Sequence, residues 1–228
     1  MINSLCSLST MVGLYSLEHQ SMFPTTALVD PQLTESLPRY QTATSGMDAL
    51  TQAIEAYWSR KSQPISDMYA IEAVREIFGS LEAACNDGTV SARSAMARAS
   101  LLSGLAFSNT KTTICHSLSY PMSTHFGIPH GQAVSITLAP MLEWNAEVIS
   151  YKLRPLLDAM EAASVGEASS RIRSLMATIG LATDLRSMGL RRADVELILE
   201  EGFYADRADH NPRHVTVEDA RQILHRIY

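Results

Sequence analysis

The stretch "SGMDALTQAIEAYWS", residues 45–59, decides the fold class, because its apolar residues recur with the period of a helix. Side chains three, four and seven positions apart share one face of a helix. Five large apolar residues occupy that face: Met47, Leu50, Ile54, Tyr57 and Trp58. We therefore expect an amphipathic helix that buries this face.

The same periodicity continues to the end of the chain. It predicts further helices over six segments: 66–88, 91–109, 131–149, 167–179, 191–201 and from 216 onward. The triplet "NDG" at 86–88 is a helix stop, and Thr216 with Asp219 has capping-box spacing, with Asp in place of the usual Glu or Gln. No repeat or Pro/Gly-rich linker interrupts this region, so residues 41–228 are predicted to form one all-α helical bundle.

Residues 1–40 carry the only signals for extended structure. These are "MVGLYSLEH" (11–19) and "TTALVDPQL" (25–33), and the turn-forming pair Asp30-Pro31 ends the second of them. We expect an irregular lead-in with room for one hairpin.

Composition and charge exclude several classes of protein. Of the 228 residues, 46% are apolar and 18% are charged, which is enough for a sizeable core. The net charge of -6 gives no broad basic surface, so neither nucleic acid nor an anionic membrane is an expected partner. Three widely spaced cysteines without a CxxC pair argue against a disulfide framework. With no apolar run of 18 residues and no signal peptide, we expect a cytoplasmic protein.

A polar stripe on the first helix is the first chemical candidate. Asp48, Gln52, Glu55 and Ser59 follow one another at helical spacing, away from the apolar face. Two oxygen-bearing side chains one turn apart can hold one cation, but such stripes are also common on solvated helix faces. Both interpretations stay open from this helix alone.

The second candidate is "KTTICHSLSYPMSTHFGIPHG", residues 111–131, which holds three histidines and one of only three lysines. His116 falls inside a predicted helix and His130 begins the next, so only the fold can bring the two rings together. Two neutral imidazoles with one carboxylate are a usual ligand set for a divalent transition metal and leave room for a substrate. Isolated histidines more often pack or form hydrogen bonds, so a metal site and ordinary packing both remain open.

Three stretches together resemble a known family. They are "DPQLTESLPRYQTATSGMDALTQAIEAYWS" (30–59), "ARASLLSGLAFSNTKTTICHSLSYPMSTHFGIPHGQAV" (97–134) and "HNPRHVTVEDARQIL" (210–224). In order and composition they resemble the carboxy-terminal, dehydroquinate synthase-like helical domain of the iron-containing (group III) alcohol dehydrogenases. Within that family, "TQAIEAYWS" and "SNTKTT..HSLSYP..THFGIPHG" are most similar to the phosphonoacetaldehyde reductase subgroup. The resemblance runs from about residue 15 to the end of the chain.

The resemblance implies a bound divalent metal, because the family holds one with an Asp and a His one turn apart on a helix and with two later histidines. The matching positions here are Asp48, Gln52, His116 and His130. Gln52 departs from the family pattern, since an amide oxygen is a neutral and weaker ligand than imidazole. Fe2+ is the expected metal, and Zn2+ or Mn2+ fits the same ligands.

The same resemblance suggests residues that act on the substrate. Tyr120 lies one turn after the first histidine, where many family members carry a further histidine, and its phenol can serve as a catalytic acid. Lys111, Thr112 and Thr113 supply a cation and two hydroxyls that suit the phosphonate group of a substrate. Lys111 also fits an ordinary surface position at a helix entrance. Two residues match no position that the family uses and are assigned to packing and to the surface, respectively: Cys115 and His125.

No nucleotide-binding motif accompanies these residues. The family transfers hydride from a nicotinamide held by an amino-terminal α/β domain with a glycine-rich turn, but the 11 glycines here form neither GxG nor GGG. The extended segments are also too few for a doubly wound sheet. We therefore expect the amino-terminal nucleotide-binding domain to be absent and NAD(P) not to bind this chain alone. The expected partners are a small-molecule substrate and either a second copy in a homodimer or a separate nucleotide-binding chain.

Three functional hypotheses follow. The expected function is that of a metal-dependent enzyme acting on a small oxygenated, phosphonate-bearing substrate by non-redox Lewis-acid chemistry, of the lyase, dehydratase or hydrolase type. The alternative is the catalytic half of an NAD(P)H-dependent aldehyde or alcohol oxidoreductase that needs a nucleotide domain in trans. The third is a non-catalytic module that binds another protein through the face that the missing domain would cover.

Overall fold

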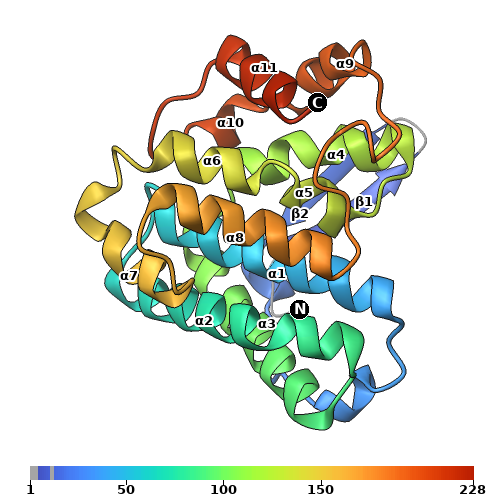
Figure 1. The fold of residues 1–228 in the computed structure, drawn as a ribbon, viewed down its shortest axis with the longest axis vertical. Helices are drawn as coiled ribbons and strands as arrows, with labels where there is room; N and C mark the ends of the chain where they lie inside the picture. The colour runs from blue at the N-terminus through green and yellow to red at the C-terminus, as the bar shows by residue number, and fades with distance from the viewer. Residues whose placement is uncertain (1–4, 11–12) are drawn as a thin grey trace.

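The computed structural model describes residues 5–10 and 13–228, and most of these lie in helices (Figure 1). Three long helices pack against one another: α1 (Arg39–Trp58), α2 (Pro64–Asn86) and α3 (Val90–Thr110). The apolar face predicted for residues 45–59 points into this core, where its five large side chains are at most 3% exposed. The predicted all-α bundle is confirmed, with one small hairpin added to it.

The remaining helices form a second group that covers α1 and α2. In this group α4 (Ile114–Phe126) and α5 (His130–Ser135) lie against each other, and α5 also packs on α1. The others are α6 (Leu138–Asn145), a 3-10 turn η3 (Ser150–Lys152), α7 (Leu153–Ala159), α8 (Val165–Thr178), α9 (Asp194–Gly202), α10 (Ala205–Ala208) and α11 (Val217–Arg226). The last three lie together at the top of Figure 1, with α9 and α10 packed on α4. No helix among the described residues has the length and apolar character needed to span a bilayer.

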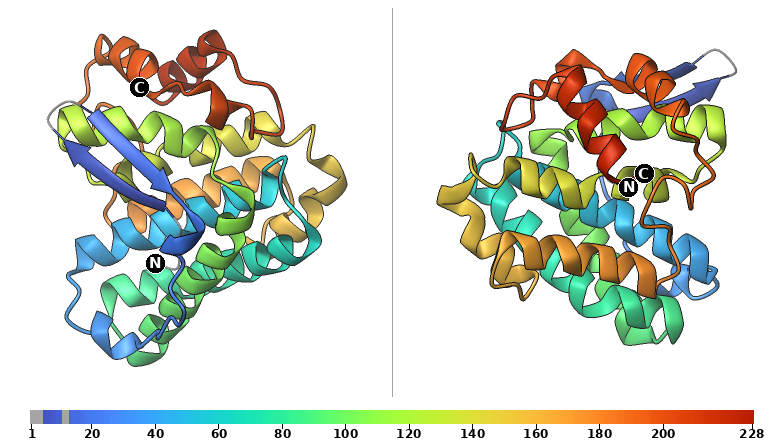
Figure 2. Two further views of the ribbon diagram at one scale, coloured as in Figure 1. Left: turned by 180° about the vertical axis from the view of Figure 1, so that it is seen from behind. Right: turned by 45° about the horizontal axis from the view of Figure 1, so that its top comes forward.

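The lead-in contains a hairpin and two short 3-10 turns. Strands β1 (Leu5–Thr10) and β2 (Gly13–Glu18) pair antiparallel, and β2 lies beside α4 (Figure 2). The chain then passes through η1 (Gln20–Met22) and η2 (Pro31–Thr34) before α1 begins. The hairpin therefore touches the helix that carries part of the polar cluster predicted from the sequence.

The segment 25–33 does not form the extended structure predicted for it. It has no paired strand, and its end is the 3-10 turn η2. Asp30 caps that turn by accepting a hydrogen bond from the Gln32 N–H at 3.0 Å, and Pro31 supplies the fixed backbone angle that starts it. The other stretch, 11–19, is extended over β2, while residues 11 and 12 lie outside the described part.

Local sequence signals explain several helix ends. α11 begins with the predicted capping box, in which the Asp219 N–H donates to the Thr216 hydroxyl at 3.1 Å and the Thr216 N–H donates to the Asp219 carboxylate at 2.9 Å. α2 ends at the predicted stop, where Gly88 adopts a φ of +61°. The segment 131–149, predicted as one helix, is two, because Pro140 has no N–H to continue the hydrogen-bond ladder across the junction.

A close approach of two helices positions α5. A Cβ on Gly131, the second residue of α5, would lie 1.9 Å from the carbonyl oxygen of Thr44 on α1. Only glycine lets the two backbones come this near. Because His130 directly precedes Gly131, the same contact fixes where the His130 ring lies relative to α1.

A methyl group added at this contact should disturb the fold. Gly131→Ala is expected to lower the free energy of unfolding by about 2 kcal/mol or more, since backbone atoms must move to admit it. Gly79→Ala is the matched control, because a Cβ there, inside α2, meets no atom within 4 Å. That variant should gain roughly 0.5–1 kcal/mol from better helix propensity. Urea denaturation compares the two, and equal stabilities would contradict the close packing.

Candidate metal centre

Three helices bring one carboxylate and two imidazoles together. Asp48 projects from α1, His116 from α4 and His130 from the first turn of α5. Asp48 Oδ1 lies 3.3 Å from His116 Nε2 and 3.8 Å from His130 Nε2. One ligand atom from each residue lies within 4.8 Å of the other two, a spacing that suits a single shared cation.

Two buried atoms of this cluster lack a hydrogen bond of good geometry. Asp48 Oδ1 and His116 Nε2 face each other at 3.3 Å, and neither forms such a bond with a described residue. Buried polar atoms that are poorly satisfied are costly, so the cluster fits a cation that would bind both atoms at once. His130 remains partly exposed, which leaves the cluster open on one side.

Glu55, which was assigned no role from the sequence, lies directly behind the cluster. Its carboxylate is fully buried and contacts His116 Nδ1 at 2.5 Å. It also accepts hydrogen bonds from the Thr113 hydroxyl at 2.6 Å and from the Cys115 N–H at 2.8 Å. A carboxylate on Nδ1 fixes the ring orientation and leaves Nε2 facing Asp48 as an electron-pair donor.

The polar stripe of α1 therefore faces inward. Glu55 and Ser59 are 0% and 2% exposed, and Asp48 and Gln52 are half-buried, so the interpretation as a solvated face is wrong. The spacing of seven residues already placed Glu55 on the same face as Asp48. The sequence therefore showed that Glu55 shares a face with Asp48. It did not show that the start of α4 packs on that face, and the role of Glu55 depends on this packing.

Burial and charge shift the pKa of each member of the cluster. Burial acts to lower the pKa of His116, but the adjacent Glu55 and Asp48 carboxylates outweigh it and raise the pKa to about 9. Burial acts to raise the pKa of Asp48, but His116 holds it below its ordinary value. Burial lowers the pKa of His130. Without a metal, His116 therefore carries a proton at neutral pH, and a bound cation must displace that proton.

Gln52, the predicted fourth ligand, lies on α1 one turn after Asp48 and is half-buried. Its Oε1 is 3.5 Å from the Ser103 hydroxyl, which is too long to hold the amide firmly. Coordination by the Gln52 amide oxygen stays a prediction.

Tyr120 stands beside the open side of the cluster. Its ring stacks on His130 with centroids 5.9 Å and planes 9° apart, and it meets Tyr204 edge-on at 6.4 Å. The Arg207 guanidinium covers the ring, with Cζ 5.1 Å from the centroid, and donates a hydrogen bond to the Thr112 hydroxyl at 2.6 Å. Burial raises the pKa of Tyr120, so the phenol keeps its proton at neutral pH. Tyr204 and Arg207 were not identified from the sequence, because no motif marks them.

The predicted substrate residues lie in three different environments. Thr113 is fully buried; its hydroxyl donates to Glu55 and accepts from Trp58 Nε1 at 3.0 Å. Its hydroxyl proton is committed to Glu55, and substrate binding by Thr113 stays a prediction. Thr112 is nearly buried with its hydroxyl at the edge of the site, and Lys111 caps α3 with a φ of +72° and is half-buried.

Cys115 and His125 lie where the sequence placed them. Cys115 is fully buried in the core, and burial raises the pKa of its thiol well above the ordinary value. His125 is exposed on α4 and contacts the Glu201 carboxylate at 2.6 Å. Cys85 and Cys115 are both free thiols.

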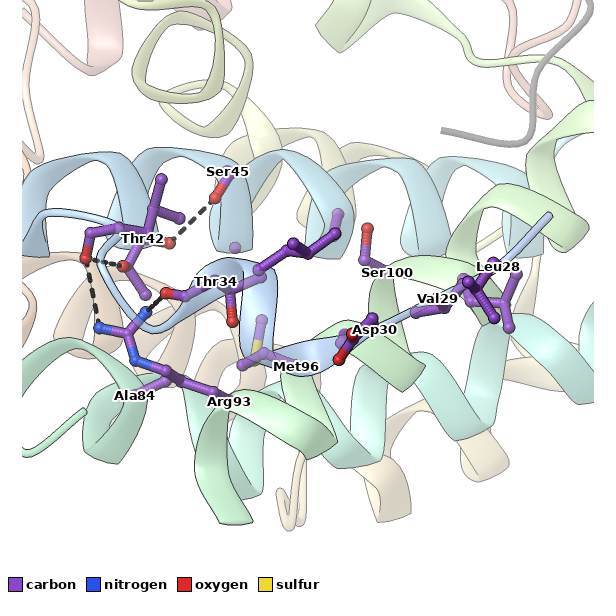
Figure 3. A pocket seen from close by; sticks show the side chains of 16 residues that line it. Leu28, Val29, Asp30, Thr34, Thr42, Ser45, Ala84, Arg93, Met96 and Ser100 are labelled. Carbon is purple, nitrogen blue, oxygen red and sulfur yellow. Dashed lines mark hydrogen bonds between the residues drawn. The ribbon is translucent and has the colours of Figure 1, made fainter. Parts of the chain in front are cut away.

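A separate pocket of about 350 Å³ lies between the lead-in, α1 and α3 (Figure 3). Leu28 of the lead-in and Met96 of α3 are among its lining residues. Arg93 holds the lead-in in place, because its guanidinium donates hydrogen bonds to the carbonyl oxygens of Thr34 and Leu37. No member of the polar cluster lines this pocket.

One carboxylate and two imidazoles that converge from three helices of a bundle form a candidate metal site. Residues 42–228 match the family model described as "Fe-containing alcohol dehydrogenase family, C-terminal". The chain therefore belongs to the iron-containing alcohol dehydrogenase family and corresponds to its carboxy-terminal domain.

Curated relatives and solved structures agree with this assignment. The chain is 32% identical over 216 residues to 1,3-propanediol dehydrogenase of Citrobacter freundii, with 90% of this chain and 55% of that protein covered. It is 29% identical over 214 residues to NAD-dependent methanol dehydrogenase of Bacillus methanolicus, with 90% and 56% covered. Sulfoacetaldehyde reductase from Bifidobacterium kashiwanohense, solved in complex with NAD+, matches with a TM-score of 0.92 and 30% identity over 99% of this chain and 60% of that one. The chain thus spans little more than half the length of these relatives.

The raised pKa of His116 predicts a pH dependence for the metal-free chain. The pKa is about 9 in the folded chain, against an ordinary value of 6.5. Protonated His116 therefore stabilises the folded chain fully below about pH 6.5, and this stabilisation is lost as the pH rises through about 9. With a chelator present, the free energy of unfolding should fall by about 2 kcal/mol over this range, as measured by urea denaturation. In Glu55→Gln the free energy of unfolding should fall clearly less over the same pH range. Identical pH profiles for the two chains would contradict the contact between Glu55 and His116.

Glu55 should also control metal affinity through His116. Glu55→Gln is expected to weaken binding of Zn2+ by about 10- to 100-fold, because the ring loses its orienting carboxylate. Competition with a coloured chelator measures the affinity. Glu201→Gln is the matched control, since it removes a carboxylate from a histidine, His125, outside the cluster. Equal losses in both variants would contradict a specific role for Glu55.

Proposed function

We propose that this chain is the metal-binding catalytic half of an NAD(P)H-dependent aldehyde or alcohol oxidoreductase. Its main support is the converged cluster of Asp48, His116 and His130, with two buried atoms that lack a well-formed hydrogen bond, in a domain whose relatives are dehydrogenases and reductases. These relatives favour the oxidoreductase alternative over the non-redox chemistry expected from the sequence.

The nucleotide-binding part is proposed to come from outside the residues of this chain. The relatives are longer, and the glycine-rich turn that would bind a dinucleotide does not occur in this sequence. A separate chain or a further domain can supply it, and a homodimer is compatible with either arrangement. In each case the open side of the cluster, where His130 is partly exposed, is where nicotinamide and substrate would meet.

The residues of the chain have distinct roles in this proposal. Asp48, His116 and His130 hold the divalent metal, with Gln52 as a fourth ligand; Fe2+ is the expected ion. A metal bound there supplies Lewis-acid polarisation of the carbonyl oxygen. Glu55 keeps His116 in the tautomer that presents Nε2.

Tyr120 is placed to handle a proton in the same site. Its phenol is protonated at neutral pH and lies against His130, so it can donate a hydrogen bond or a proton to the oxygen that gains charge as the carbonyl is reduced. Tyr204, packed edge-on against Tyr120, keeps that ring in place.

The substrate is proposed to be a small aldehyde or alcohol with an anionic group. The sequence motifs resemble those of phosphonoacetaldehyde reductases, and one similar solved structure is a sulfoacetaldehyde reductase. Both names describe two-carbon aldehydes that carry an oxyanion group.

Metal binding is the first test of this proposal. The chain should bind about one Zn2+ or Fe2+ after dialysis against the metal, and both Asp48→Ala and His130→Ala should lose it, because each removes a ligand. Gln52→His should bind at least about tenfold more tightly, since imidazole is the better ligand. Metal analysis by mass spectrometry measures the stoichiometry. A weaker site in Gln52→His would show that the fourth ligand is wrongly assigned.

Hydride transfer is the second test. The chain is joined to the amino-terminal part of the Citrobacter freundii 1,3-propanediol dehydrogenase that the match leaves uncovered, and oxidation of NADH is followed with short aldehydes. The fusion should reduce aldehyde at a rate that Asp48→Ala lowers by at least about 100-fold. Product formed by the chain alone, without nicotinamide, would favour the non-redox alternative instead.

A further inference from the structure

Arg207 brings a positive charge to the edge of the metal centre. It lies on α10, which packs on α4, and its guanidinium covers the Tyr120 ring with Cζ 5.1 Å from the centroid. Tyr120 in turn stacks on His130. The Arg207 guanidinium and the His130 ring therefore both lie against the Tyr120 ring.

Among the side chains that the structure describes, no carboxylate pairs with Arg207. Among the described residues its guanidinium forms no ion pair, and its one side-chain hydrogen bond goes to the neutral hydroxyl of Thr112 at 2.6 Å. An arginine that is partly buried without a counter-ion is suited to an anion that arrives with a ligand.

The geometry of the guanidinium suits an oxyanion with two oxygens within reach of its paired donors. Arginine has five N–H donors in a planar fork, and the bond to Thr112 occupies one of them. That bond and the Tyr120 ring hold the side chain in one orientation before a ligand binds, which lowers the entropy lost on binding. The remaining donors can form paired hydrogen bonds to two oxygens of a phosphonate or sulfonate.

Other candidates for this role fit less well. Thr113 has its hydroxyl committed to Glu55 and Trp58. Lys111 lies at the end of α3 and, unlike arginine, offers a point charge without paired donors. Arg207 is the cation that contacts both the Tyr120 ring and Thr112.

We propose that Arg207, oriented by Thr112 and Tyr120, binds the anionic oxyacid group of the substrate, and so selects short aldehydes or alcohols that carry a phosphonate or sulfonate. The reacting oxygen of such a molecule faces Asp48 and His130 while its anionic end meets Arg207. This assignment rests on the proposed function, because it names the substrate class of the same site.

The experiment measures binding to the chain itself. Calorimetric titrations use 2-hydroxyethylphosphonate and 2-hydroxyethanesulfonate as anionic probes and 1,3-propanediol as an uncharged one, with Zn2+-loaded and with metal-free chain. Arg207→Met, which keeps a side chain of similar length, should weaken binding of both anions by about 10- to 100-fold and change diol binding by less than about twofold. Arg207→Lys should recover part of the loss.

Arg186→Met is the matched control, because Arg186 also covers a tyrosine ring, Tyr228, with Cζ 5.0 Å from its centroid. It should leave all three affinities unchanged. Lys111→Met tests the competing cation. Retention of anion affinity within twofold in Arg207→Met, or equal losses for anions and diol, would overturn the proposal, as would a wild-type chain that prefers the diol.

The two proposals fail in different ways. A chain that binds no metal but still loses phosphonate affinity in Arg207→Met would refute the oxidoreductase proposal and support the anion site. A chain that binds metal and loses anion affinity only in Lys111→Met would refute the role of Arg207 and leave the metal centre intact.

Discussion

The buried charge of Glu55 is the constraint on which the metal centre depends. Its two oxygens receive a hydroxyl, a backbone N–H and an imidazole, all from residues 113–116 at the start of α4. A buried carboxylate without such partners would be strongly destabilising, so the start of α4 cannot slide or rotate relative to α1 without losing them. The position of His116 Nε2 follows from this contact, and the Gly131 contact places His130 in the same way.

The same contact explains the electrostatic character of the site. Asp48 and Glu55 put two carboxylates on either side of one imidazole, and the pKa of His116 of about 9 shows how strongly they favour positive charge there. A proton on His116 supplies this charge when no metal is bound, and a divalent cation held by Asp48, His116 and His130 would supply more of it. The contacts of Glu55 and Gly131 therefore hold the three side chains in place before a cation binds.

The sequence predicted the helical fold and the cluster more fully than the surroundings of the cluster. Apolar periodicity located most helices, and the resemblance to a known family singled out Asp48, His116 and His130, which the fold then brings together. A polar stripe has the same pattern whether it faces water or a partner helix, so the role of Glu55 depended on tertiary contacts. Arg207 lies on a four-residue helix, which is too short to show any periodicity. The segment 25–33 resembled a strand by composition, but no partner strand lies beside it.

Two poles of opposite character define how a substrate would lie in the proposed site. In that proposal a metal at the cluster would accept an oxygen at one end and Arg207 would attract an anion at the other, with the stacked rings of Tyr120 and His130 beside both. A molecule with both groups is held at two points, which places its carbonyl carbon in one orientation toward an incoming hydride, whereas an uncharged alcohol is held at one. Selectivity that arises in this way acts on the orientation of the reacting atoms, so it appears in the rate of the chemical step as well as in affinity.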